Sequence, residues 1–481
     1  MRNLLLLLAL LVFFLLLSCK TDQLPPGKYL VIANVTVIDG TDAPAKPGYN
    51  VLIANNRIIS IEKADTSQLP AGAQVIDGKG KFLIPGLWDM HAHPFLDQER
   101  FPHRLALNLY LANGITGLRD MFSPLDDVNR YRAELSAGKI VGPRIITCGP
   151  LIDGPKPAWA NSIAVSDEKQ AREAVVSLKG RGADFVKVYD LLPREAYFAI
   201  ADEAKRIGIP FVGHVPLAIS LKEASDAGQK SIEHFTGILQ ACSTDEEKLH
   251  EEALKEASGP DNSAAIRALL QIDVKALNSY NSEKAAALFT SFVKNGTWLD
   301  PTMVAYTVDS GNYDRNDYRL KYIPRALREE WDPKNSIVFK AFSEQDFQNS
   351  KLVFNRYIEI VRIMHQAGVE FLAGTDSPVV PYCFPGFGLH DEMALFVKAG
   401  LTPLQALQTA TRNPAKFFNL LDSLGTVEAG KIANLVILEA DPLQDIGNTR
   451  KISTVIIEGK VIDQESIGKL LTEVQTAFSA Q

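Results

Sequence analysis

The central part of the chain, residues 86–419, alternates short apolar segments with stretches of helical periodicity, and this alternation limits the fold more than any other feature. PRIITCG, DFVKVYD and PFVGHV are separated by stretches such as EKQAREAVVSLKGRG, which ends in glycine as helices commonly do. Strand, helix and strand in succession indicate parallel βαβ units. About eight such strands are present, the number that closes a TIM barrel, so we predict a (β/α)8 barrel over residues 86–419.

Short β-type segments flank this central region on both sides. YLVIANVTVID and NVLIANNRIISIE alternate apolar and polar residues around turn signals, and ANLVILEAD and STVIIEGKVID repeat the pattern near the C-terminus. We predict a small β-sandwich domain built from residues 29–85 and 420–470, followed by a C-terminal tail over residues 471–481.

Two stretches interrupt the strand–helix alternation. Residues of about 243–292 have the composition of inserted helices, and residues 305–350 are rich in Tyr, Asp, Asn and Arg. Both follow predicted barrel strands, where lids and specificity loops commonly lie. The alternative interpretation is additional bulk with no part in the site.

The N-terminus differs from the rest of the chain. A basic start and an unbroken apolar run over residues 4–17 indicate an export signal over residues 1–18. The ending LLSC resembles the bacterial lipoprotein cleavage box, in which Cys19 becomes the lipidated first residue; an ordinary secretory signal is the alternative. Residues 19–28 would then form a tether to a membrane, in the bacterial cell envelope on the periplasmic or outer-membrane face.

Charge and cysteine content exclude several classes of protein. The net charge is −7 and the chain has no basic stripe that could neutralise phosphates, so we expect no nucleic-acid partner. Beyond Cys19 only Cys148, Cys242 and Cys383 remain. Three cysteines cannot all pair with one another, and they are too sparse for a thiolate zinc cage.

Four of the chain's eight histidines stand at the ends of predicted barrel strands, together with one aspartate. His91 and His93 end the first strand, His214 ends PFVGH, His234 ends KSIEH and Asp376 ends EFLAGTD. Residues two apart in a strand point to the same side, so His91 and His93 should both face the interior. Because the carboxyl-terminal edge of a TIM barrel carries the active site, we predict that these residues form one site.

Lys187 in DFVKVYD should point into the barrel as well. An inward ammonium is costly unless it is paired, and it has no lone pair for a metal. Desolvation lowers the pKa of a buried lysine, so its neutral amine could take up carbon dioxide and become a carbamate, which is in effect a carboxylate. The alternative is a salt bridge to Asp120 or Asp376.

As a set, these motifs resemble the amidohydrolase superfamily, and within it the branch of imidazolonepropionase-like proteins and prolidase-type dipeptidases. The resemblance covers nearly the whole chain after the signal and rests on the Lys187 strand and on KFLIPGLWDMHAH, GITGLRDM, GHVP, SIEH, GTDS, GLTPLQALQTATRNPAKFF and GTVEAGKIANLVILEADPL. Asn434 stands where the family usually has aspartate. It lies in the β-rich part, so we expect it to affect a local turn rather than catalysis.

The resemblance implies a site with two divalent metal ions. His91, His93 and Asp376 would bind one ion, His214 and His234 the other, and carboxylated Lys187 would bridge them. Imidazole and carboxylate ligands suit zinc, with manganese, iron and cobalt as alternatives. Two such ions lower the pKa of a bridging water, and Asp376 would accept its proton and deliver it to the leaving amine.

Two further residues are candidates for binding substrate. Tyr189 lies two residues beyond Lys187 and could hydrogen-bond a substrate oxygen, or it could be a packed core or rim tyrosine. Arg119 in GLRD ends the second strand and could bind a substrate carboxylate. An internal ion pair of Arg119 with Asp120 or Glu233 is the alternative.

The leading hypothesis is an exported, lipid-anchored, binuclear metallohydrolase that cleaves an amide bond in a small molecule or peptide, as a dipeptidase or N-acyl amino acid hydrolase. One alternative is a hydrolase of a cyclic amide, as in imidazolonepropionase-like proteins. From another class, the chain could be a catalytically silent metal- or ligand-binding lipoprotein. The substrate's side chains, the native metal and the oligomeric state, a homo-oligomer included, stay open.

Overall fold

The computed structural model describes residues 28–65, 69–257, 262–311, 313–332, 334–336, 339 and 342–479. The predicted signal peptide and its lipidation site Cys19 lie outside these residues, as does the tether except for Lys28. None of the helices in the described part combines the length and apolar character needed to cross a membrane.

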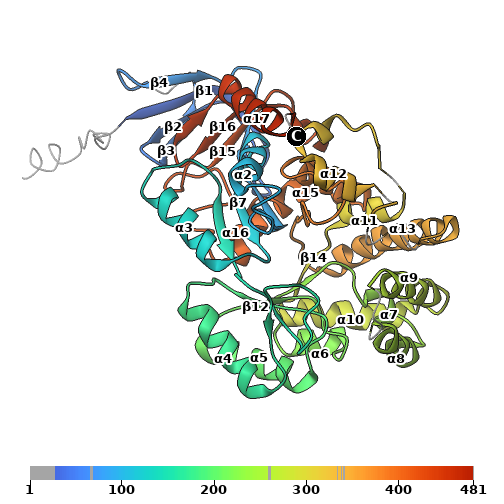
Figure 1. The fold of residues 1–481 in the computed structure, drawn as a ribbon. Helices are drawn as coiled ribbons and strands as arrows, with labels where there is room; N and C mark the ends of the chain where they lie inside the picture. The colour runs from blue at the N-terminus through green and yellow to red at the C-terminus, as the bar shows by residue number, and fades with distance from the viewer. Residues whose placement is uncertain are drawn as a thin grey trace, which may run out of the picture.

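The two ends of the described chain pair with each other in one mixed sheet of eight strands (Figure 1). The contact between the ends is antiparallel, with Ile84 opposite Val436. Asn434 Oδ1 accepts a hydrogen bond from the Glu458 amide in the last hairpin at 2.7 Å, so Asn434 contacts a local turn. The structure records one sheet here, and the predicted two-layered sandwich is not confirmed. The strands follow the order β17(Lys460–Ile462), β16(Ile452–Ile457), β15(Leu435–Leu438), β5(Phe82–Pro85), β1(Tyr29–Val37), β2(Lys46–Ala54) and β3(Arg57–Lys63), with β4(Gln74–Asp77) also paired to β1.

The central region forms parallel strands covered by helices, as the alternating pattern predicts. One sheet has the order β6(Leu87–Ala92), β7(Ile115–Asp120) and β8(Arg144–Thr147). A second has the order β10(Ile163–Ala164), β9(Ile152–Asp153), β11(Val186–Val188), β12(Phe211–Gly213), β13(Ser231–Glu233) and β14(Trp298–Asp300). This parallel α/β fold fits a TIM barrel.

Backbone hydrogen bonds link the two parallel sheets on both sides. The chain before β11 contacts the end of β8, and the segment 371–376 lies between β14 and β6. The links are hydrogen bonds from Asp184 N to Thr147 O (2.8 Å), from Leu372 N to Leu299 O (3.0 Å) and from Met90 N to Ala373 O (2.8 Å).

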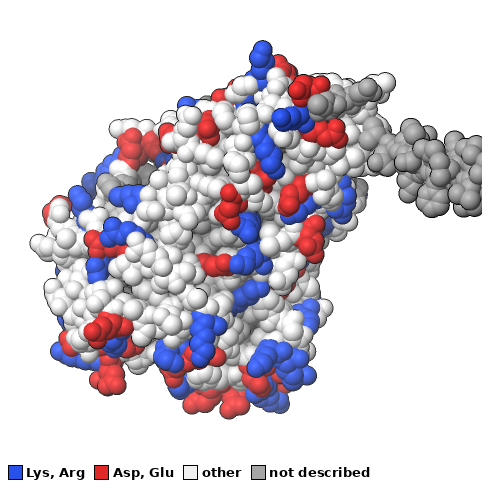
Figure 2. Space-filling view, turned by 180° about the vertical axis from the view of Figure 1, so that it is seen from behind, with Lys and Arg blue, Asp and Glu red and all other residues white. Residues whose placement is uncertain are grey.

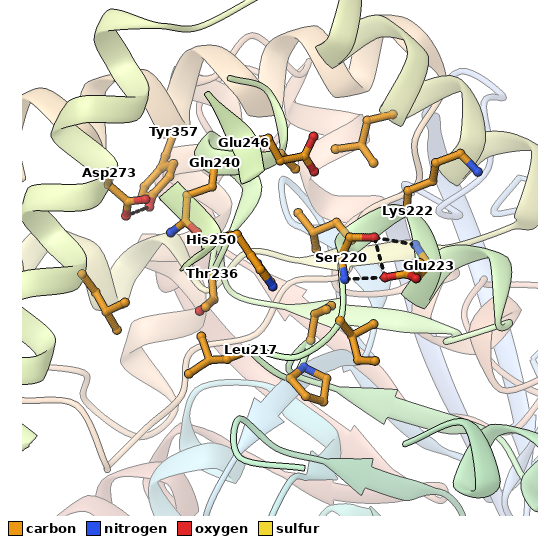
Figure 3. Close-up of a pocket in the computed structure, with 18 of the residues that line it drawn as sticks. Leu217, Ser220, Lys222, Glu223, Thr236, Gln240, Glu246, His250, Asp273 and Tyr357 are labelled. Atoms are coloured by element: carbon orange, nitrogen blue, oxygen red, sulfur yellow. Dashed lines mark hydrogen bonds between the residues drawn. The ribbon is translucent and has the colours of Figure 1, made fainter. Parts of the chain in front are cut away.

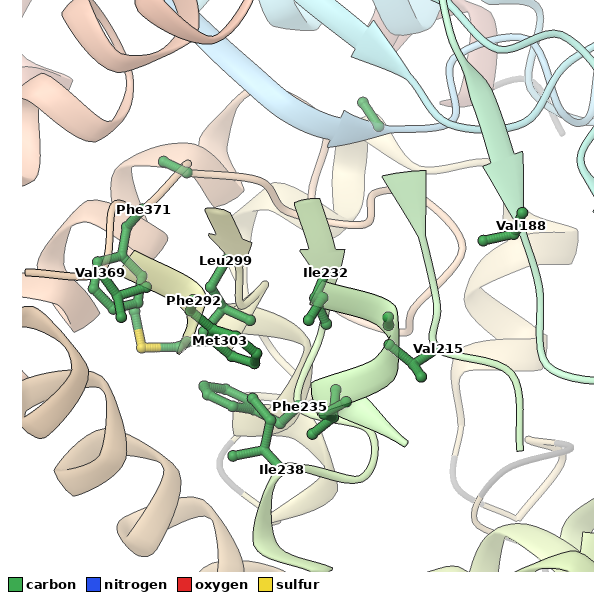
Figure 4. Packing of buried hydrophobic residues seen from close by; sticks show 14 of the residues in the cluster. Val188, Val215, Ile232, Phe235, Ile238, Phe292, Leu299, Met303, Val369 and Phe371 are labelled. Carbon is green, nitrogen blue, oxygen red and sulfur yellow. The ribbon is translucent and has the colours of Figure 1, made fainter. Parts of the chain in front are cut away.

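Helices pack against the outer faces of these strands and bury the main apolar core. Helix α5(Arg194–Ile207) ends at Gly208, whose φ of 69° favours glycine, and it buries Tyr197 and Ile200. Ile232 and Leu299 of neighbouring strands lie with Phe235 and Phe292 in the part of the core shown in Figure 4. The other helices around the strands are α2(His103–Ala112), α3(Leu125–Ser136), α4(Glu168–Gly180), α6(Leu221–Asp226), α14(Phe387–Lys398), α15(Pro403–Thr409) and α16(Arg412–Phe417).

The two interrupting stretches are largely helical. They include α8(Glu246–Ala257), α9(Asn262–Asn278), most of α10(Ser282–Asn295), most of α11(Met303–Asp309), η1(Tyr318–Tyr322), α12(Arg325–Trp331) and the start of α13(Glu344–Ala367). The short helix α7(Ile238–Ala241) comes directly before the first stretch. Helices α7 to α10 gather at one end of the molecule in Figure 1.

The predicted C-terminal tail is helical over the residues that the structure describes. Residues 471–479 are the second half of helix α17(Gln464–Ser479), which packs on α2. Val474 and Phe478 are buried, and the Phe478 ring meets Phe101 edge to face at 5.4 Å. The apolar period of this helix supplies a buried face, which explains why the segment is ordered against the fold.

Acidic and basic side chains are intermingled on the face of the molecule in Figure 2. Among the described residues on that face there is no continuous basic surface of the kind that binds a phosphate backbone.

Candidate metal centre

Five of the six predicted ligands lie in the parallel strands or directly after them: His91 is in β6, Lys187 is in β11, and His93, His214 and His234 each stand one residue beyond a strand. Asp376 ends the segment 371–376, which the structure joins to β14 and β6 by isolated bridges and backbone hydrogen bonds and not as the strand expected from EFLAGTD. Because the carboxyl ends of neighbouring parallel strands meet at one edge, the fold brings these side chains together.

Asp376 lies at the centre of this group. Its Oδ1 is 2.9 Å from His93 Nε2 and 3.4 Å from His91 Nε2, and its Oδ2 is 3.9 Å from His234 Nε2. His91, His234 and Asp376 each offer one ligand atom, and these three atoms lie within 4.8 Å of one another. Side chains at this spacing can share a metal ion.

Lys187 and His214 complete the group. Lys187 Nζ is 3.5 Å from His91 Nε2, and the His214 ring meets the His234 ring edge to face at 4.9 Å between centroids. The structure therefore places all six predicted ligands around one centre.

Hydrogen bonds on the far side of three histidine rings set their orientation. His91 Nδ1 is 3.0 Å from Glu233 Oε2, His214 Nδ1 is 2.8 Å from Asp190 Oδ1, and His234 Nδ1 is 2.6 Å from Thr302 Oγ1. With the proton on Nδ1, each Nε2 keeps its lone pair for a metal, which is the usual arrangement around metal-bound histidine. The donor set and its supports thus fit divalent metal ions.

Protonation of these groups suits metal binding as well. Burial lowers the pKa of His91 well below its usual value and that of His234 to about 3, so both imidazoles are neutral. Burial alone would raise the pKa of Asp376, but the hydrogen bond with His93 and the nearby His234 hold it at about 2. Burial lowers the pKa of Lys187, against the opposing effect of the Asp376 carboxylate.

The backbone is strained where the site is built. Asp376, His234 and Thr302 have φ values of 61°, 64° and 45°, in the left-handed region that non-glycine residues rarely adopt. Such strain persists where the surrounding structure holds it, and it is common at functional sites. Here it turns the chain at the strand ends and directs these side chains toward the centre.

The structure places Arg119 inside the barrel in an internal ion pair, and a contact with substrate stays a prediction. The side chain is fully buried, and its guanidinium donates to Glu233 Oε2 (2.6 Å), Asp300 Oδ2 (2.9 Å) and Ser231 Oγ (2.8 Å). These contacts occupy the guanidinium inside the barrel. The pair with Glu233 is the internal ion pair expected from the sequence as the alternative to substrate binding. Through Glu233, Arg119 supports the orientation of His91.

Tyr189 lies beside the group, and its contact with substrate stays a prediction. Its ring packs on the His214 ring at 4.1 Å between centroids, and its hydroxyl accepts a hydrogen bond from Trp159 Nε1 at 2.7 Å. Trp159 is 41% exposed, so this pair connects His214 with the protein surface.

Several supporting residues were missed from the sequence. Asp89, which accepts hydrogen bonds from the His91 amide and from Thr375, lies two residues before His91 in an apolar strand. Asp300, which closes the strand WLD, was missed as well, whereas Glu233 was considered only as an ion-pair partner of Arg119 and not as the support of His91. A carboxylate inside an otherwise apolar strand was the signal that could have identified all three.

An α/β fold with imidazole, lysine and carboxylate groups at the carboxyl ends of its parallel strands is the architecture of a metal-dependent hydrolase. The model of the Amidohydrolase family matches residues 82–462. The chain belongs to the amidohydrolase family, whose members are hydrolases of carbon–nitrogen bonds.

Solved structures share this fold at low sequence identity. A putative prolidase from Bifidobacterium longum is 23% identical with a TM-score of 0.65, over 94% of this chain and 100% of that one. A bottromycin amidohydrolase is 23% identical with a TM-score of 0.72 (93% and 90% covered), and a Xaa-Pro dipeptidase with bound methionine is 20% identical with a TM-score of 0.65 (91% and 100% covered).

Adenine deaminase 1 of Carboxydothermus hydrogenoformans is 27% identical over 119 residues, which are 24% of this chain. The matched part is 18% of the deaminase, so this chain covers less than a fifth of that relative's length.

Arg119→Met is expected to lower the free energy of unfolding by about 3–5 kcal/mol, because Glu233 and Asp300 would stay buried without their cation. Urea denaturation of metal-loaded protein measures this change. Arg172→Met is the control: Arg172 pairs with Asp202 at the surface, so its loss should leave the free energy of unfolding close to that of wild type. If Arg119→Met had the stability of wild type and differed from it only in a raised KM, the result would contradict the structural role and support substrate binding by Arg119.

Proposed function

We propose that this chain is a binuclear metal-dependent amidohydrolase that hydrolyses an amide or peptide bond of a small substrate. The observation that carries the proposal is the group of histidines and Asp376 whose ligand atoms meet while Glu233, Asp190 and Thr302 hold the opposite ring nitrogens. We also infer that the two parallel sheets form one closed (β/α)8 barrel, on the basis of the backbone hydrogen bonds that link them on both sides.

In this proposal, His91, His93 and Asp376 would hold one divalent ion and His214 and His234 the other. Lys187, a buried amine with a lowered pKa, would react with carbon dioxide to form a carbamate and release a proton, and the carbamate would bridge the ions. Two divalent cations, zinc by the preference of imidazole and carboxylate ligands, would supply an acidified water and polarise the substrate carbonyl.

Asp376 would handle the proton of the reaction. It is ionised at neutral pH, since its pKa is about 2, and its carboxylate lies among the three histidines where the attacking water must be. The carboxylate would accept the proton of that water and deliver it to the departing amine, so that one residue serves as base and then as acid. The fixed left-handed backbone at Asp376 would keep this carboxylate in place.

A dipeptidase or N-acyl amino acid hydrolase is the activity we favour. The putative prolidase and the Xaa-Pro dipeptidase among the structures of similar fold support a peptide substrate. The intact set of six candidate ligands argues against a silent binding protein.

The direct test is a screen of dipeptides and N-acyl amino acids on metal-loaded protein. Asp376→Asn should lower kcat by about 10²–10⁴-fold, because it removes the proton acceptor. Asp226→Asn, which changes an exposed carboxylate on α6, is the matched control and should keep wild-type activity. Equal release of amino acids by wild type and Asp376→Asn would refute the assignment.

Metal content tests the bridging role of Lys187. Elemental analysis of the purified chain should give about two equivalents of divalent metal, and Lys187→Ala should bind about one or fewer, since the bridging anion is lost. Lys230→Ala is the control, because partly buried Lys230 donates to the Phe417 carbonyl away from the ligands. One tightly bound metal that Lys187→Ala leaves unchanged would contradict a binuclear site.

We further propose that the chain is exported and lipid-anchored at Cys19, with the sequence of residues 1–20 as its only support. Metabolic labelling with an alkyne fatty acid should mark the full-length chain and place it in the membrane fraction of a bacterial host. Cys19→Ser should lose the label and Cys148→Ser should keep it. A label that persists in Cys19→Ser would disprove the anchor.

A further inference from the structure

A cavity of about 880 Å³ lies between the helical insertion and the loops after β12 and β13 (Figure 3). Val215, which directly follows His214, and Thr236, two residues after His234, are part of its wall. The loops that carry two candidate ligands therefore also contribute to the cavity. Its volume is in the range of small-molecule sites, which hold ligands much larger than a single methyl or hydroxyl group.

The helical insertion supplies much of this cavity. Helices α8, α9 and α10 form its wall together with α13 and the loops after β12 and β13. The side chains contributed by α9, α10 and α13 are mainly apolar: Ile266, Leu269, Leu270, Leu288, Val353 and Phe354. The insertion is thus part of the candidate site rather than additional bulk, and an apolar stretch of substrate fits these walls.

One carboxylate lines the apolar part of the cavity. Asp273 on α9 accepts a hydrogen bond from the Tyr357 hydroxyl at 2.8 Å through Oδ2, and the Gln240 side chain also lies close enough to lower its pKa. Its Oδ1 is buried and has no hydrogen-bond partner within 3.5 Å. No described Lys, Arg or His forms an ion pair with it. Figure 3 shows Asp273, Tyr357 and Gln240 together on one side, and Ser220 and Glu223 on the other. Burial raises the pKa of Asp273 to about 6, so at neutral pH a carboxylate here is mostly charged and lacks a cation.

The cations around the cavity are already paired. Arg194 binds Glu223, Lys284 Nζ is 2.5 Å from Glu246 Oε2, and Lys222 pairs with Asp226. These pairs leave none of the three lysine and arginine side chains to neutralise Asp273. His250 lines the cavity as well but forms no ion pair with Asp273, so this carboxylate has no cationic partner among the described residues.

We propose that this cavity binds a substrate side chain that is apolar along its length and ends in a cation, an ammonium or guanidinium group, which Asp273 receives. The inference rests on the proposed amidohydrolase function and names its substrate class, amides and peptides of basic amino acids. A long aliphatic stem would pack on the leucines of α9 while its charged end pairs with the Asp273 carboxylate.

Binding of a matched pair of compounds tests this assignment without any hydrolysis. Lysinol and norleucinol have no amide bond and differ at the far end of the side chain, where lysinol carries an ammonium group. Calorimetry on the metal-loaded full chain should show lysinol binding at least about tenfold more tightly, as a charge-assisted hydrogen bond to a buried carboxylate predicts. Equal affinity for the two compounds in wild type would overturn the proposal.

Two variants locate the source of the preference. Asp273→Asn keeps the shape of the side chain and should reduce the lysinol preference to within about threefold. Glu247→Gln makes the same charge change at an exposed position on the rim and should keep the full preference. A preference that survives in Asp273→Asn, with thermal unfolding like that of wild type, would overturn the proposal.

Hydrolysis of matched dipeptides separates this inference from the proposed function. Lysyl peptides should have a higher kcat/KM than their norleucyl equivalents, and Asp273→Asn should remove that advantage while it leaves norleucyl peptides within about threefold of wild type. Hydrolysis with no preference for lysyl peptides refutes the cavity assignment alone. Asp273-dependent lysinol binding without hydrolysis of any peptide refutes the amidohydrolase proposal and leaves the cation site standing.

Discussion

The buried guanidinium of Arg119 is the interaction on which the centre of this protein depends. Glu233 and Asp300 are both fully buried and both contact it, and Glu233 in turn holds His91. Two carboxylates without a cation at this depth would raise each other's pKa and cost several kcal/mol. Arg119 therefore makes it possible to bury charged groups directly beneath the histidines. Its own guanidinium is fully buried in these ion pairs.

The supports around that centre explain why six side chains from distant segments can act together. Each of three histidine rings is held by a second residue, and the backbone is strained at His234 and Asp376, so the geometry is set by surrounding contacts rather than by local preference. Such preorganisation is what a metal site needs, because ligands that must first be ordered bind with lower affinity.

The cavity suggests a way in which an insertion would change specificity without changing chemistry. The strands belong to the region that matches the amidohydrolase family. The α8–α10 insertion adds apolar walls and the Asp273 carboxylate to a cavity whose wall also includes the loops directly after His214 and His234. Loops and insertions at the carboxyl ends of barrel strands are where such folds vary, since substitutions there do not disturb the core.

The amino-acid sequence by itself determined the alternation of strands and helices and the residues that end the strands. His91, His93, Lys187, His214, His234 and Asp376 could be predicted to meet because parallel strands bring their carboxyl ends to one edge, whatever packs around them. The helical face of α17 was missed, because its partner α2 lies more than three hundred residues earlier in the chain.

Only the tertiary structure decided what each charged group contacts. Arg119 contacts Glu233 and Asp300, and Asp273 meets Tyr357, 84 residues away, at the wall of a cavity. Periodicity indicates which side of a strand or helix a residue occupies, but a hydrogen bond or an ion pair depends on the distance between atoms from separate segments. That distance exists only after the chain has folded, which is why the ligands could be read from the sequence and their supports could not.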